Sequence, residues 1–109
     1  MEVTLLYFDD CPNWLTAAAL VDRLAAEDPD VIVVRRIVDT DEQAQRVRFL
    51  GSPTILIDGR DPWAPEGVPV GLSCRMFMTP EGPRGAPTWE QLTFAVDAAR
   101  RARPSTGAA

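Results

Sequence analysis

The sequence predicts one α/β domain with the element order β-α-β-α-β-β-α. Three segments rich in β-branched and aliphatic residues, at 2–8, 31–38 and 54–57, have the composition of buried strands. They alternate with two segments, 13–27 and 41–49, in which apolar residues recur at helical spacing. The chain of 109 residues is long enough for one hydrophobic core.

The rest of the predicted fold follows a loop-rich stretch. Most of the prolines and glycines fall within residues 59–87, and only 73–79 in that stretch is predicted as a strand, the fourth. A capping box of Thr88 and Gln91 then begins the last helix. We expect a four-stranded mixed sheet flanked by three helices, with parallel pairing across the strand–helix–strand crossovers and an antiparallel last pair. The predicted domain covers residues 1–103, and 104–109 form a disordered tail.

Composition excludes several classes of function. The net charge of −5 supplies no basic field for phosphate, so we expect no nucleic-acid partner. No apolar run approaches the roughly 20 residues of a membrane span, and the N-terminus lacks the pattern of a signal peptide. We therefore expect a cytoplasmic protein with no membrane partner. The absence of histidine excludes Cys-His and Ser-His pairs, and we assign no cofactor and no metal ligand.

The stretch DDCPNW at residues 9–14 carries the first of two cysteines. Pro12 suits the first turn of a helix, which places Cys11 at or near the N-cap. The helix dipole favours a thiolate there, while the carboxylates of Asp9 and Asp10 oppose it. Trp14 stands where a dithiol motif has its second cysteine, so this stretch alone has a single thiol.

Two motifs now point to a family. The chain resembles thioredoxin-like proteins through CPNW at 11–14 and GSPT at 51–54, and the resemblance covers nearly its whole length. It implies that Pro53 is cis and close to Cys11. It also implies that the loop of Ser52, Pro53 and Thr54 binds an extended substrate by strand-like hydrogen bonds, with Trp14 beside it.

The chain is similar in particular to small actinobacterial-type members of that family that carry CPNW. They share the segments DGRDP at 58–62 and GLSCR at 71–75. Some such proteins are labelled as related to alkylmercury lyase. The resemblance suggests thiol chemistry without naming a substrate.

Two functions from different classes fit this pattern. In the first, Cys11 attacks a disulfide, a sulfenic acid or a thiol adduct, and an external thiol or Cys74 releases the product, an activity of thiol–disulfide oxidoreductase type. The partner is then a disulfide-containing protein or a low-molecular-weight thiol. In the alternative, the fold is a non-redox binding module or a soft-metal binder that uses Cys11, with or without Cys74.

Cys74 itself has two interpretations. We expect a strand residue packed against the last helix and remote from Cys11, which makes Cys11 the more exposed and more reactive thiol. The other interpretation is that the loop at 58–73 returns to the site and makes Cys74 the partner of Cys11.

Two further side chains in this part of the chain have open roles. Trp63 is expected to anchor its loop and to form one wall of a pocket. Arg75 is expected to be a solvated strand residue, with binding of an anionic group as the alternative.

Overall fold

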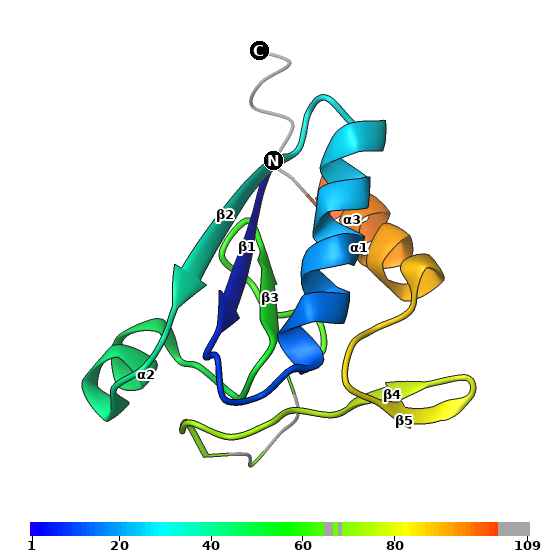
Figure 1. Cartoon of the computed structure of the whole chain (residues 1–109). Coiled ribbons are helices and arrows are strands. Elements are labelled where there is room, and N and C mark those ends of the chain that lie inside the picture. Colours follow the sequence, from blue (N-terminus) through cyan, green and yellow to red (C-terminus); the bar gives the residue numbers. More distant parts are fainter. Residues whose placement is uncertain (65–66, 68, 103–109) are drawn as a thin grey trace.

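The computed structural model describes residues 1–64, 67 and 69–102, and Figure 1 shows the arrangement of the elements. In chain order the elements are β1 (Glu2–Tyr7), α1 (Asn13–Glu27), β2 (Ile32–Ile37), α2 (Asp41–Val47), β3 (Thr54–Ile57), β4 (Phe77–Thr79), β5 (Gly82–Arg84) and α3 (Trp89–Ala102). The predicted tail at 104–109 lies outside the described residues. Within the described part of the chain, no helix is both long and apolar enough to cross a membrane.

The main sheet has three strands in the order β2-β1-β3. The central strand β1 runs parallel to β2, with Val3 opposite Val33, because α1 forms the crossover between them. It runs antiparallel to β3, with Leu5 opposite Ile55, so the parallel pairing predicted across the second crossover is wrong. The strand that follows the predicted cis-proline loop is therefore paired directly with the strand that leads to Cys11.

The predicted four-stranded sheet is wrong. The segment expected as its fourth strand splits in two: β4 begins only at Phe77 and pairs with β5 in a separate two-stranded sheet. Ahead of it, Cys74 makes a single parallel bridge to Ser52, outside the named strands. At the other end of β3, Arg60 turns back to bridge Ile57. Both ends of the outer edge of β3 are thus occupied by short contacts, which leave no continuous edge for a fourth strand.

The strand β5 was not predicted, because Pro83 lies within it and proline removes a ladder donor. Proline is tolerated here because β5 is one of only two strands in its sheet. Gly82, with φ of 102°, begins β5 directly after the turn at Pro80 and Glu81. The hairpin β4–β5 directs the chain back toward α3.

The apolar residues of β1 alternate between two cores. Val3 and Leu5 are fully buried in the larger cluster beneath α1 and α3, which lie side by side on one face of the sheet in Figure 1. Leu6 points to the other face and packs with Ala44 of α2 and with Phe49. This alternation fixes the register of β1 and so the position of the turn that follows it.

The helix boundaries largely follow local signals. The helix α1 spans the predicted residues 13–27, and α3 begins after the capping box, in which Thr88 and Gln91 exchange hydrogen bonds of 2.9 and 3.0 Å. The helix α2 is two residues shorter than predicted. It ends at Val47 because Arg48 has the left-handed φ of 54°, which stops the helix.

Candidate functional site

The two cysteines form a disulfide. Cys11 and Cys74 are 63 positions apart in sequence, and their Cα atoms lie 5.8 Å apart. The expectation that Cys74 lies in a remote strand is therefore wrong, and the alternative that the loop returns to the site is the correct one. The bond joins the turn before α1 to the extended segment that passes beside β3.

The turn at the end of β1 positions Cys11. The backbone N–H of Cys11 donates to the Phe8 carbonyl at 3.5 Å, and the Phe8 N–H donates to Ser52 Oγ at 3.3 Å. The N-cap of α1 is Pro12, so Cys11 lies one residue ahead of the cap rather than on it. No side chain caps this helix, and the Leu15 N–H donates to the Pro12 carbonyl at 3.1 Å.

The segment 73–75 is held along Ser52 by its backbone. Ser52 N–H donates to the Ser73 carbonyl at 2.7 Å, and Arg75 N–H donates to the Ser52 carbonyl at 2.9 Å. Gly51 permits this close passage, because a Cβ on it would lie 2.9 Å from Arg75 Cβ and 3.1 Å from the Ser73 carbonyl oxygen. Its φ of 121° is also one that residues with a side chain rarely adopt.

Arg75 anchors the same segment from its side chain. Its guanidinium donates to both oxygens of Asp61, at 2.6 and 3.1 Å, and to the Trp63 carbonyl at 2.8 Å. A longer bond of 3.4 Å reaches Thr54 Oγ1. The side chains of Arg75 and Asp61 are only 4% and 10% exposed. The expectation of a solvated arginine is wrong. The guanidinium also does not bind an external anion, because the carboxylate of Asp61 is already paired with it.

The Ser52–Pro53 peptide bond is cis, as the resemblance implies. Cys11 Sγ lies 3.8 Å from the Ser52 carbonyl oxygen, so the loop is also close to the cysteine. Ser52, Pro53 and Thr54 are all buried, and the chain's own residues 73–75 take the strand-like position beside Ser52. The backbone edge that was expected to bind an extended substrate is therefore filled from within the molecule.

The order of exposure of the two cysteines is the reverse of the prediction. Cys11 is 1% exposed, whereas Cys74 is an exposed residue. Burial follows from the position of Cys11 between β1 and the Ser52 loop. Exposure of Cys74 follows from the extended segment, in which neighbours face opposite sides and Arg75 takes the inner side.

Trp14 and the two aspartates near Cys11 lie in different surroundings. Trp14 is half-buried and stacks on Tyr7, with ring centroids 4.4 Å apart and planes at 23°. It therefore packs the first turn of α1 onto the end of β1. Asp9 and Asp10 are exposed on the turn.

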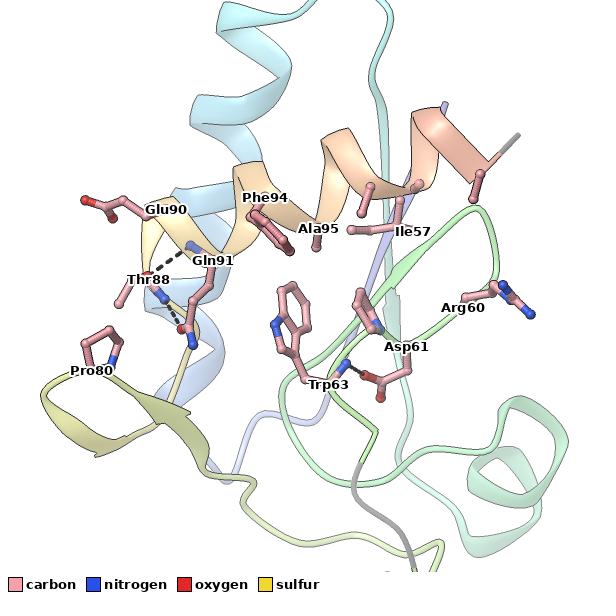
Figure 2. A pocket seen from close by; sticks show the side chains of 14 residues that line it. Ile57, Arg60, Asp61, Trp63, Pro80, Thr88, Glu90, Gln91, Phe94 and Ala95 are labelled. Carbon is pink, nitrogen blue, oxygen red and sulfur yellow. Dashed lines mark hydrogen bonds between the residues drawn. The ribbon is translucent and has the colours of Figure 1, made fainter. Parts of the chain in front are cut away.

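A hollow with a volume of about 1000 Å³ lies between α3 and the loop after β3. Figure 2 shows Trp63 and Phe94 pointing toward one another across it. Trp63 is half-buried and meets the Phe77 ring edge-on, with centroids 5.8 Å apart. The two roles predicted for Trp63, anchoring its loop and lining a pocket, are both confirmed.

The sequence interpretation missed the pairing of Asp61 with Arg75. Asp61 lies in the segment DGRDP, which was noted only for its family resemblance, and Arg75 was weighed only as a solvated residue or as a binder of an external anion. Opposite charges in two otherwise loop-like segments were the available signal. That signal is weak, because most charges in loops are solvated and only the tertiary fold buries this pair.

Comparison of the chain with known proteins finds no matching family model, no matching curated protein and no significant match among solved structures.

Proposed function

We propose that this chain is a thioredoxin-like thiol protein in which Cys11 and Cys74 undergo reversible disulfide exchange. The observation that carries the proposal is the disulfide between the start of α1 and the segment beside the cis Pro53 loop. It replaces the single-thiol chemistry expected from the sequence with a two-thiol site. The partner is a disulfide-containing protein or a low-molecular-weight thiol.

The scaffold supports reversibility because it holds Cys74 without the sulfur–sulfur bond. The two backbone hydrogen bonds to Ser52 and the buried pair of Arg75 with Asp61 involve neither sulfur atom. When the bond is reduced, these contacts keep the thiols close to one another. The second thiol then acts at a high effective concentration, which favours closure of the ring over release of the segment.

The exchange proceeds in two balanced steps. A thiolate R–S⁻ attacks one sulfur of the Cys11–Cys74 bond, and the electron pair of that bond leaves on the other cysteine as a thiolate. A second R–S⁻ attacks the mixed disulfide and forms R–S–S–R. The two reductant thiols are thus oxidised to one disulfide, and the protein gains two thiols. The reverse sequence oxidises the protein.

Titration of the wild-type protein with glutathione and glutathione disulfide tests this function. We expect a reversible transition between disulfide and dithiol without loss of the far-ultraviolet circular dichroism signal. The effective concentration of the two thiols should be at least about tenfold higher in the folded protein than in urea. Cys74→Ser is the matched control and should form only mixed disulfides. A bond that is reduced only when the protein unfolds would mean a structural crosslink and would refute the proposal.

A further inference from the structure

We propose that Cys74 is the sulfur that external partners attack and that Cys11 is the leaving and resolving thiol. This assignment rests on the proposed function and reverses the roles that the order of the cysteines in the sequence suggests. It follows from three features of the site: access, the place of Cys11 at the helix start, and occupancy of the Ser52 edge.

The two sulfurs differ first in how accessible they are to a thiolate from solvent. Disulfide exchange requires the incoming thiolate to reach one sulfur from the side opposite the bond that breaks. Cys11 is 1% exposed, packed between β1 and the Ser52 loop, so that approach is blocked. Cys74 is exposed, and both residues before it, Leu72 and Ser73, are exposed as well. An external thiolate therefore meets Cys74.

The start of α1 favours Cys11 as the leaving group. Cys11 directly precedes the N-cap Pro12, and no side chain caps the first N–H groups of the helix. The positive end of the helix dipole stabilises the negative charge that a departing thiolate carries. Asp9 and Asp10 on the same turn are exposed, so water screens their opposing charges. No helix begins at Cys74, which lies between β3 and β4 in an extended segment.

The hydrogen bonds already made by the Ser52 backbone determine how a partner can approach the site. Both backbone groups of Ser52 that a substrate strand would use are already bonded to Ser73 and Arg75. The side chain of Arg75 is in turn fixed to Asp61. A partner therefore reaches Cys74 from solvent and does not add a strand at the cis-proline loop. This geometry suits a low-molecular-weight thiol or an exposed cysteine of a protein.

The assigned step keeps atoms and electrons in balance. The incoming R–S⁻ forms a bond to Cys74 Sγ, the Cys11–Cys74 bond breaks, and its electron pair leaves on Cys11, which takes a proton from water. In the opposite direction the Cys11 thiolate attacks Cys74 Sγ in the mixed disulfide and expels R–S⁻. Cys74 is the site of every mixed disulfide in both directions.

Alkylation of the fully reduced wild-type protein tests the assignment without any substitution. Native protein receives less than one equivalent of iodoacetamide, and peptide mass spectrometry measures the label on each cysteine. We expect Cys74 to react at least about tenfold faster than Cys11. In urea the two rates should converge, because unfolding gives both thiols equal access. Equal or faster labelling of Cys11 in the native protein would overturn the assignment.

The single-cysteine variants supply a second measurement. Cys11→Ser should form a mixed disulfide with glutathione disulfide at least about tenfold faster than Cys74→Ser. If Cys74→Ser reacts as fast, Cys11 is open to partners and the assignment fails. Neither result depends on whether the wild-type bond is reversible, which the glutathione titration reads separately. Failure of the role assignment and failure of the proposed function are therefore distinguishable.

Discussion

The two ends of α1 are joined to distant parts of the chain in different ways. At its start, Cys11 is linked to the segment 73–75, which the buried pair of Arg75 and Asp61 holds in place. At its end, the C-cap residue Asp28 pairs with Arg100 of α3, 72 positions away. The side chains of Asp28 and Arg100 are 21% and 35% exposed, so water reaches this second pair.

Both ion pairs join an arginine to an aspartate, and they differ in burial. We therefore expect burial to decide how strongly each arginine holds the segment that carries its partner. A half-buried pair that water reaches loses part of its attraction to solvent and contributes less to stability than the contact alone suggests. A buried pair has lost the solvation of both charges, so each partner depends on the other. We therefore expect the Arg75–Asp61 pair to control the position of Cys74, and the Arg100–Asp28 pair to adjust stability only slightly.

The largest expected effect comes from Asp61→Asn. This substitution leaves the buried guanidinium of Arg75 without a counter-charge while it keeps the shape of the side chain. Removing one partner of a buried pair costs about 3 kcal/mol or more in the free energy of unfolding, measured by urea denaturation of the oxidised protein. The effective concentration of the two thiols should also fall, because the segment that carries Cys74 loses its anchor.

Arg75→Met combined with Asp61→Leu is the control for this prediction. The double variant removes both charges and keeps much of the packing, so it should recover a large part of the lost stability. A loss as large as that of Asp61→Asn would mean that hydrogen-bond geometry, rather than an uncompensated charge, accounts for the effect. In that case the contrast between the two ends of α1 would need another cause.

Local signals were sufficient for the elements that precede the loop-rich stretch. The boundaries of α1 and β3 matched the prediction at both ends, because apolar periodicity and the breaker Pro29 act within a few residues. The predicted strand at 73–79 failed in its first half. Ser73 and Arg75 bond to Ser52 rather than to a neighbouring strand, and nothing within the segment signals that choice.

The candidate site needed information that the sequence does not contain. The position of Cys11 at the helix start was expected from Pro12, and the cis Pro53 was expected from the resemblance; both agree with the structure. The approach of Cys74 depends on the return of a long loop, whose closure no local pattern determines. The exposure of the two cysteines was therefore predicted in the wrong order, because it depends on which residues pack against Arg75 and Ser52 in the folded chain.

A medium effect is expected for Gly51→Ala. Its φ of 121° is strained for alanine, and the added Cβ would lie 2.9 Å from Arg75 Cβ. Backbone strain of this kind costs about 1–3 kcal/mol, and the clash adds to it. The collision pushes the segment of Cys74 away from Ser52. Glutathione titration should show a lower effective concentration of the thiols, and urea denaturation should show reduced stability.

Gly59→Ala is the matched control. Gly59 also has a positive φ, of 84°, but nothing lies within 4 Å of a Cβ built there. It should lose about 1–2 kcal/mol of stability from strain alone and leave the thiol equilibrium unchanged. If both variants shift the thiol equilibrium equally, the close passage beside Gly51 does not position Cys74.

The smallest effect is expected at the far end of α1, and it depends on pH. The hydrogen bond from Arg100, with a second from the Asp30 N–H, holds the pKa of Asp28 below its ordinary value of 3.8. The unfolded chain therefore binds a proton on Asp28 at a higher pH than the folded protein does. The resulting stabilisation is present above the ordinary pKa and is lost as pH falls through the lowered one.

Arg100→Gln should be slightly less stable than wild type at pH 7. The gap between the two proteins, measured by urea denaturation, should close as the pH falls below 3.8. A gap that stays constant with pH would mean that Arg100 acts through packing on α1, and that the half-buried pair contributes no charge term to set against the buried one.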